Sequence, residues 1–123
     1  MSFQVLALIM TCAGAVLGAR FLFAGASVLK EWGLEATAAA LIVSRRIGAL
    51  YLGLALMFFL GRAAGPSDLR SAACLVMAGA IAALACLGLF DFGARRVNAA
   101  IFRSVAAEAV LAAAFVWVWW GGR

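Results

Sequence analysis

The chain has 123 residues, of which 68% are hydrophobic and 12% are charged, and its formal net charge is +5. A soluble domain is nearer half apolar and a quarter charged, so this composition excludes an ordinary soluble protein. A hydrocarbon core of about 30 Å needs roughly 20 apolar residues per helix, so the length allows four spans with short loops.

The residue types present also restrict the chemistry. The sequence has no histidine, which removes most zinc sites, bis-histidine haem ligation and histidine acid–base catalysis. Its three cysteines lie in apolar segments without a CxxC pair. The basic residues stand singly or in pairs beside apolar blocks, with no basic tail, so we expect no nucleic-acid partner. We therefore expect no metal, no cofactor and no enzymatic activity.

Four apolar blocks predict an all-α bundle of four transmembrane helices with short loops, in a single domain of residues 1–123. The helices are expected over about 3–29, 37–60, 69–90 and 97–120. In the first block, the spacing of Gly14, Gly18 and Gly25 places all three on one helix face. The Gly14–Gly18 pair is a GxxxG, which lets two backbones approach closely in lipid. This block lacks the positive start of a signal peptide, so we expect a retained helix.

The second block is interrupted by Arg45 and Arg46, and two interpretations compete. The helix either enters the hydrocarbon only at Ile47, after an interfacial turn over residues 38–44, or spans from Ala38 and buries one arginine. Residues 47–60 cover only about 21 Å of helix, which is short for a span. We therefore favour arginines that lie just below the interface and snorkel towards it.

Tryptophans mark the expected interfaces, where amphipathic rings are favoured. Trp32 stands in the short charged connection after the first block, and three more close the fourth block at Trp117, Trp119 and Trp120. Gly65-Pro66 forms the clearest break between helices.

Glu108 is the only charged residue in the stretch 104–120, and Arg103 lies just before it. An ionised group near a bilayer centre costs about 2.5 kcal/mol or more, so it normally has a partner. Arg103 is five residues away, which is not a same-face spacing. We expect a partner on another helix, either Arg45 or Arg46, with Arg20 next. The pair could fix helix register, or Glu108 could bind a proton or cation.

The remaining arginines suit an anionic lipid headgroup, which a guanidinium binds with two parallel hydrogen bonds. They also bear on membrane orientation. The first and third connections hold five cations if both central arginines are counted with them, and the other side holds Arg62, Arg70 and Arg123. The positive-inside rule then places both termini outside; if Arg45 and Arg46 lie within the membrane, the count is equal and gives no orientation.

Two stretches carry a family resemblance. The segment SRRIGALYLGLAL at residues 44–56, followed by Gly61-Arg62, resembles the second helix of small four-helix bacterial inner-membrane proteins of unknown function. The spacing of Arg20, Gly25 and Lys30 resembles the first helix of DoxX-like proteins, although the histidine-bearing segment of that family is missing. The resemblance implies a four-helix fold in a bacterial inner membrane.

Together these patterns favour a non-catalytic, polytopic membrane protein. We expect an accessory or scaffold subunit that packs against a membrane-protein partner, or against a second copy of itself, through its glycine faces. The alternative is a small transporter or channel component in which Glu108 and arginines line a polar path.

Overall fold

The computed structural model describes residues 2–121, which form five helices and no strand. Within this range, four helices are long and apolar enough to cross a membrane: α1 (Phe3–Phe23), α3 (Ala38–Leu60), α4 (Asp68–Gly93) and α5 (Ile101–Gly121). The remaining helix, α2 (Gly25–Glu31), has seven residues. The predicted all-α class is confirmed, and the helices are those of a multi-pass membrane protein. Arg123, used in the orientation count, lies outside the described residues.

The helices belong to two compact units. Unit 1 contains the first turn of α1 together with α4 and α5, and unit 2 contains the rest of α1, α2 and α3. The expectation of a single transmembrane domain concerns both units together, and it stays a prediction.

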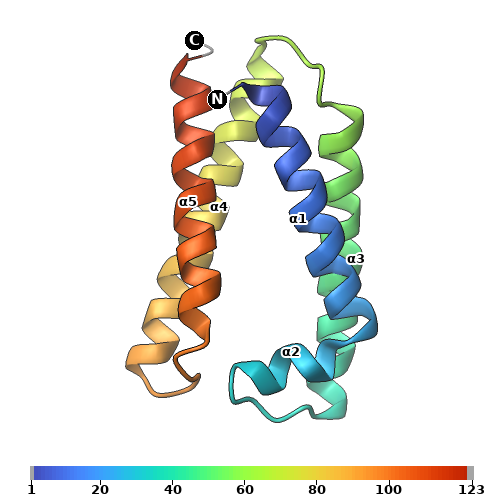
Figure 1. Cartoon of the computed structure of the whole chain (residues 1–123), viewed down its shortest axis with the longest axis vertical. Helices are drawn as coiled ribbons and strands as arrows, with labels where there is room; N and C mark the ends of the chain where they lie inside the picture. Colours follow the sequence, from blue (N-terminus) through green and yellow to red (C-terminus); the bar gives the residue numbers. More distant parts are fainter. Residues whose placement is uncertain (1, 122–123) are drawn as a thin grey trace. The chain divides into compact units, whose positions relative to one another are not determined.

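In unit 1, α4 and α5 run antiparallel and pack side by side (Figure 1). The buried positions of α4 alternate between spacings of four and three residues, a pattern that keeps one helix face against a partner. They are Cys74, Ala78, Ile81, Ala85 and Gly88. Most of these side chains are small, so the helices approach closely. A Cβ on Gly88 would lie only 2.8 Å from Cγ2 of Val105.

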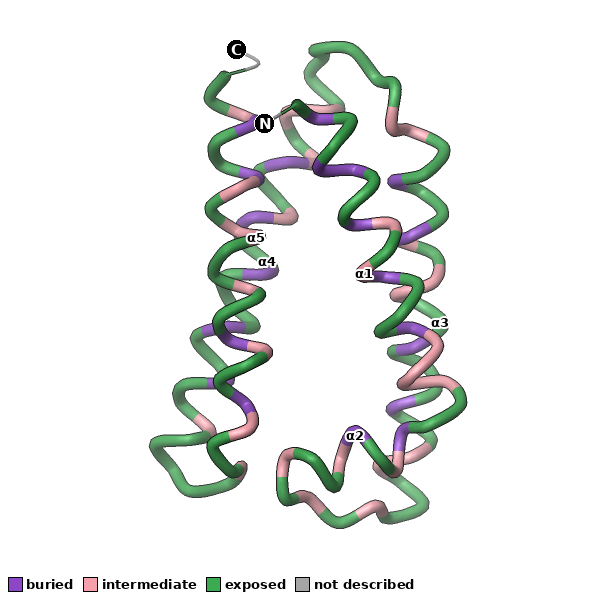
Figure 2. The backbone as a smooth tube through the Cα atoms, in the orientation of Figure 1, coloured by how far each residue is buried: buried purple, intermediate pink, exposed green. Residues whose placement is uncertain are grey.

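In unit 2, small residues bring α1 against α3. A Cβ on Gly14 would lie 3.1 Å from Cβ of Ala55, and a Cβ on Gly18 would lie 2.8 Å from Cγ of Leu52. A Cβ on Gly48 would lie 2.7 Å from the Gly18 carbonyl oxygen, so the two backbones are in direct contact. Figure 2 shows buried positions recurring along α3 on the side that faces α1.

The predicted single helix over residues 3–29 is wrong, because the chain breaks at Ala24 (φ −133°, ψ 35°). A helix over 3–29 would be about 40 Å long, more than the hydrocarbon core. The break is stabilised by α3, since Ser44 Oγ donates to the Phe21 carbonyl oxygen at 3.0 Å. A continuous helix would give that oxygen the Gly25 N–H instead. Gly25 permits the approach, because a Cβ there would lie 2.5 Å from Ser44 Oγ.

The connection between α4 and α5 also differs from the sequence expectation. The helix expected over 69–90 is α4, which continues past residue 90 to Gly93 and ends in a Schellman motif. In it, the Arg96 N–H donates to the Asp91 carbonyl at 2.9 Å and the Arg95 N–H to the Phe92 carbonyl at 3.0 Å. Arg95 adopts the left-handed conformation, with φ 60°.

The helix expected from about residue 97 is α5, and it begins only at Ile101. The Asn98 side chain accepts the Ala100 N–H at 3.1 Å, and such local side-chain bonds compete with helical ones. α3 and α4 begin within one residue of the starts predicted from the sequence. Thr37 and Ser67 are their N-caps, and each side-chain oxygen accepts an N–H three residues on.

Candidate functional site

The charged residues among the apolar helices are the candidate functional residues, and the helix bounds indicate the depth of each in the membrane. Arg20 lies in the last turn of α1, and Arg103 is the third residue of α5. A helix of this length rises about 32 Å, close to the hydrocarbon thickness. Both residues therefore lie near helix ends, where an interfacial position suits them better than one deep in the membrane.

Arg20 is engaged inside unit 2. Its Nη2 lies 2.7 Å from Glu31 Oε2, and both side chains are 40% exposed. This ion pair joins α1 to α2 across the break between them. Because it is partly exposed, it contributes modestly, about 0.2–1 kcal/mol. Next to it, the Phe21 ring stacks on Tyr51 and meets Trp32 edge-on, at centroid distances of 5.8 and 6.4 Å.

Arg45 and Arg46 lie in the second and third turns of α3, and both side chains are exposed. Residues 38–44 are helical, so the interpretation of that stretch as an interfacial turn is wrong. Neither guanidinium forms a hydrogen bond or ion pair with the described residues of unit 2. Their neighbour Ser44 instead faces inward and is buried.

Glu108 lies about 10 Å from the start of α5, roughly a third of the way along the helix. Its Oε1 accepts a hydrogen bond from Ser104 Oγ at 2.6 Å. Its Oε2 is buried and has no hydrogen-bond partner among the described residues. The carboxyl group therefore receives one hydrogen bond, from its own helix, where an ionised carboxylate can accept several.

Glu108 is half-buried and lies on the face of α5 that holds the buried residues of the helix. Ile101, Val105, Phe115 and Val118 are the buried residues of the helix. Glu108 continues the spacing from Ile101 and Val105, so it occupies a place that the pattern would give to an apolar residue. The contacts of Gly88 with Val105 and Ile101 set an antiparallel register in which Glu108 is level with residues 81–85 of α4, a segment without charges.

The segment of α4 that faces Glu108 supplies no cation. Residues 71–90 of α4 contain no lysine or arginine. Arg20, the third of the expected partners, is bound to Glu31. Pairing with Arg45 or Arg46 would join the two units and stays a prediction.

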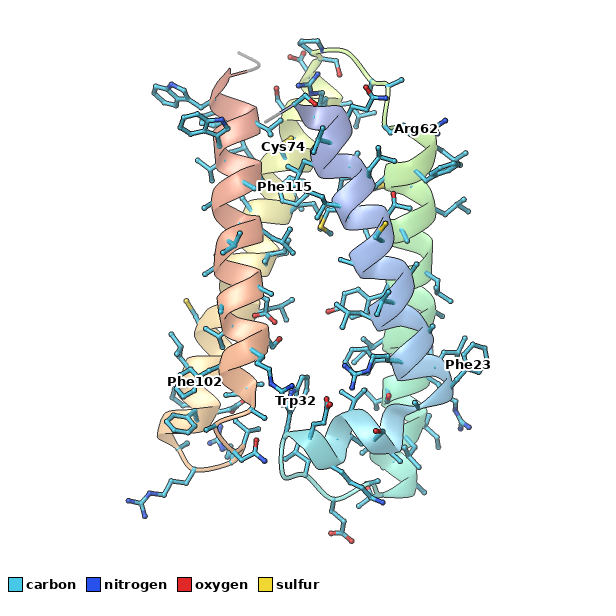
Figure 3. All side chains as sticks on the ribbon, viewed as in Figure 1. Phe23, Trp32, Arg62, Cys74, Phe102 and Phe115 are labelled. Carbon is cyan, nitrogen blue, oxygen red and sulfur yellow. The ribbon has the colours of Figure 1, made fainter. Side chains whose placement is uncertain are left out.

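The aromatic residues expected at interfaces stand near helix ends. Trp117, Trp119 and Trp120 occupy the last turns of α5, and the last two rings meet edge-on at 6.1 Å. Phe23 was not singled out by the sequence. It ends α1, is 83% exposed and points away from the α1–α3 pair (Figure 3). A large exposed ring at a helix end suits contact with lipid.

Sequence reasoning missed three residues that shape these sites. Ser44 donates a hydrogen bond across to the Phe21 carbonyl of α1, and Ser104 donates one to Glu108. The backbone of α1 packs directly against Gly48. The spacing of Ser44 and Gly48 is a small-xxx-small pair, which could have indicated the contact face of this helix.

Among residues 2–121, no three histidine, cysteine, aspartate or glutamate side chains lie close enough to hold a metal ion. Comparison of the chain with models of known protein families, with curated proteins and with solved structures gives no match.

Proposed function

We propose that the chain is a non-catalytic accessory subunit of a bacterial inner membrane, which binds a partner membrane protein or a second copy of itself through open glycine positions on α3 and α4. The observation that carries this proposal is a pair of open glycines. A Cβ added to Gly53 or to Gly79 would meet no described atom within 4 Å, whereas Gly18 and Gly48 are in tight contact.

The open glycines have small neighbours at helical spacing. Ala49 precedes Gly53 by four residues, and Ala83 follows Gly79 by four. Small residues at this spacing let a second membrane helix approach closely. The face first expected to bind a partner, that of Gly14, Gly18 and Gly25, is occupied by α3. A partner is therefore assigned to α3 and α4 instead.

The experiment compares the mass of the assembly in mild detergent for the natural chain, for Gly53→Leu and for Gly79→Leu. Both substitutions should reduce the assembly to the 12.8 kDa monomer without lowering its helicity or thermal stability. Gly93→Leu is the matched control, because Gly93 is equally open but stands at the end of α4. A natural chain that is itself a lone monomer when extracted would refute the proposal.

A second candidate function is that of a small transporter or channel component, and the buried, unpartnered Oε2 of Glu108 favours it. Ionisable groups inside membrane helices often bind the transported proton or ion. The purified chain in liposomes should then dissipate a proton gradient, and Glu108→Gln should abolish that flux. Arg103→Gln, five residues away on the same helix, is the control. Equal flux with Glu108→Gln would exclude this role.

The bilayer itself is the other partner. Lys30, Arg45, Arg46, Arg95 and Arg96 are assigned to one side of the membrane if the two α3 arginines belong to the first connection, against three cations on the other side. With that count, the positive-inside rule supports both termini outside.

A further inference from the structure

We propose that Arg45 and Arg46 bind the phosphate group of an anionic phospholipid at the outer surface of α3. The proposal rests on the membrane location of the chain and is independent of its role as an accessory subunit. Three observations carry it: the level of the two arginines relative to the end of α1, their lack of hydrogen-bond or ion-pair partners among the described residues of unit 2, and the apolar side chains beside them.

The packing of unit 2 fixes the level of the arginines. Gly18 of α1 contacts Gly48 of α3, and Gly25, just beyond the end of α1, contacts Ser44. The end of α1 at Phe23 is therefore level with the segment of α3 that carries Arg45 and Arg46. Since α1 alone is long enough to cross the hydrocarbon, this level is the edge of the apolar layer, where phospholipid phosphates lie nearby.

The direction of the side chains brings the charges still closer to the headgroups. Side chains on a helix lean towards its N-terminus. The N-terminal end of α3, at Ala38, is the end that connects to α2 and lies beyond the last turn of α1. Arg45 and Arg46 therefore lean towards the nearer interface, in the direction that snorkelling requires.

The two guanidinium groups are available for an anion. Both side chains are exposed, and neither forms an ion pair or hydrogen bond with the described residues of unit 2. Glu31 is bound to Arg20, and the exposed Glu35, the nearest acid along the chain, forms no salt bridge with either arginine in the described part of unit 2. Arginine suits phosphate because its planar fork donates two parallel hydrogen bonds.

Apolar side chains identify the ligand as a lipid rather than as free phosphate. Ile42 and Leu50 stand four residues before and after Arg46 and so flank it on the same helix face. Their exposed fractions are 51% and 70%. An acyl chain can cover this surface while the phosphate lies at the guanidinium, whereas a free anion would leave the surface exposed.

The test measures lipid retention by native mass spectrometry, with the purified chain offered equal amounts of phosphatidylglycerol and phosphatidylcholine. The natural chain should retain the anionic lipid preferentially. The double variant Arg45→Gln/Arg46→Gln should lose this preference by about tenfold or more, because it removes hydrogen bonds between charged groups. Folding should persist, since both side chains are exposed and form no hydrogen bond or ion pair with the described residues of unit 2.

The matched control is Arg62→Gln/Arg70→Gln, which removes the same charge elsewhere. Arg62 and Arg70 already contact the aromatic rings of Phe59 and Phe3 and donate to backbone carbonyls. This control should keep the lipid preference, and an equal loss would refute a site at Arg45 and Arg46. So would an unchanged preference in the first double variant.

Two further arms complete the test. If the glutamine variant fails to fold, Arg45→Lys/Arg46→Lys keeps the charge without the fork and should retain an intermediate amount of lipid; retention equal to the natural chain would count against the site. Inorganic phosphate added to the delipidated chain should not raise its unfolding temperature as phosphatidylglycerol does. An equal rise would show a free-anion site and overturn the assignment to lipid.

Discussion

The contact between α1 and α3 depends on the missing side chain of Gly48, and Gly48→Ala tests it. A Cβ at this position would lie 2.7 Å from the Gly18 carbonyl oxygen and 2.8 Å from the Leu22 backbone nitrogen. Both obstacles are backbone atoms, so no rotamer change can relieve the clash. The helices must separate, and their contacts over the neighbouring turns weaken.

The expected size follows from two opposing effects. Overpacking of a close contact typically costs about 1–3 kcal/mol. Alanine in place of a helical glycine gains about 0.5–1 kcal/mol through backbone entropy. Gly48→Ala should therefore lower the free energy of unfolding by about 1–2 kcal/mol. Gly18→Ala should lower it less, because Leu52, a flexible side chain, forms part of its obstacle.

Gly53→Ala is the matched control on the same helix. A Cβ at Gly53 meets no described atom within 4 Å, so only the helix-propensity gain of about 0.5–1 kcal/mol remains. Reversible unfolding in mixed detergent micelles, followed by helicity, measures all three variants. If Gly48→Ala proves as stable as Gly53→Ala, the close approach of α1 and α3 does not exist and the packing argument fails.

Three further predictions have definite outcomes. Arg95→Gly should stabilise the chain by about 1 kcal/mol, because it relieves the left-handed backbone, and Gly33→Ala, at a φ of 77°, should destabilise it by a similar amount; no difference between them would contradict the turn geometry. If Glu108 pairs with Arg46, the double Glu108→Gln/Arg46→Gln variant should be more stable than the worse single variant, since a lone buried charge is the costly state, while additive losses would exclude the pair. A cysteine at Ser2 should react from the same side of the membrane as one placed between α3 and α4, and opposite accessibility would disprove the four-span topology.

The helix content was predictable because it depends on local sequence. Apolar blocks of about 20 residues can satisfy their backbone in lipid only as helices, so composition and length fix the number of spans. Thr37 and Ser67 form the caps of α3 and α4 by bonding to N–H groups three residues on, and such contacts can be read from spacing. The charged residues of the first connection, Lys30, Glu31 and Glu35, can be recognised from the sequence in the same way.

The break at Ala24 could not be predicted in this way, because its cause lies on another helix. Nothing in residues 3–29 other than length argues against one continuous helix. The chain turns there because Ser44, about twenty residues later, supplies the bond that the Phe21 carbonyl loses, and Gly25 leaves the space for it. The late start of α5 has a different, local cause. The Asn98 side chain competes with helical hydrogen bonding there, which apolar periodicity does not reveal.

The candidate sites divide along the same line. The sequence by itself determined that Glu108, Arg45 and Arg46 are charges in apolar surroundings, since an ionisable group within a hydrophobic run can be recognised from a single sequence. Only the tertiary structure decided which charges are already bound to another element: Arg20 of α1 pairs with Glu31 of α2, whereas the exposed Arg45 and Arg46 form no ion pair with the described residues of unit 2. Partners are set by distances between segments remote in sequence, and side-chain pairing therefore emerges only when the helices pack.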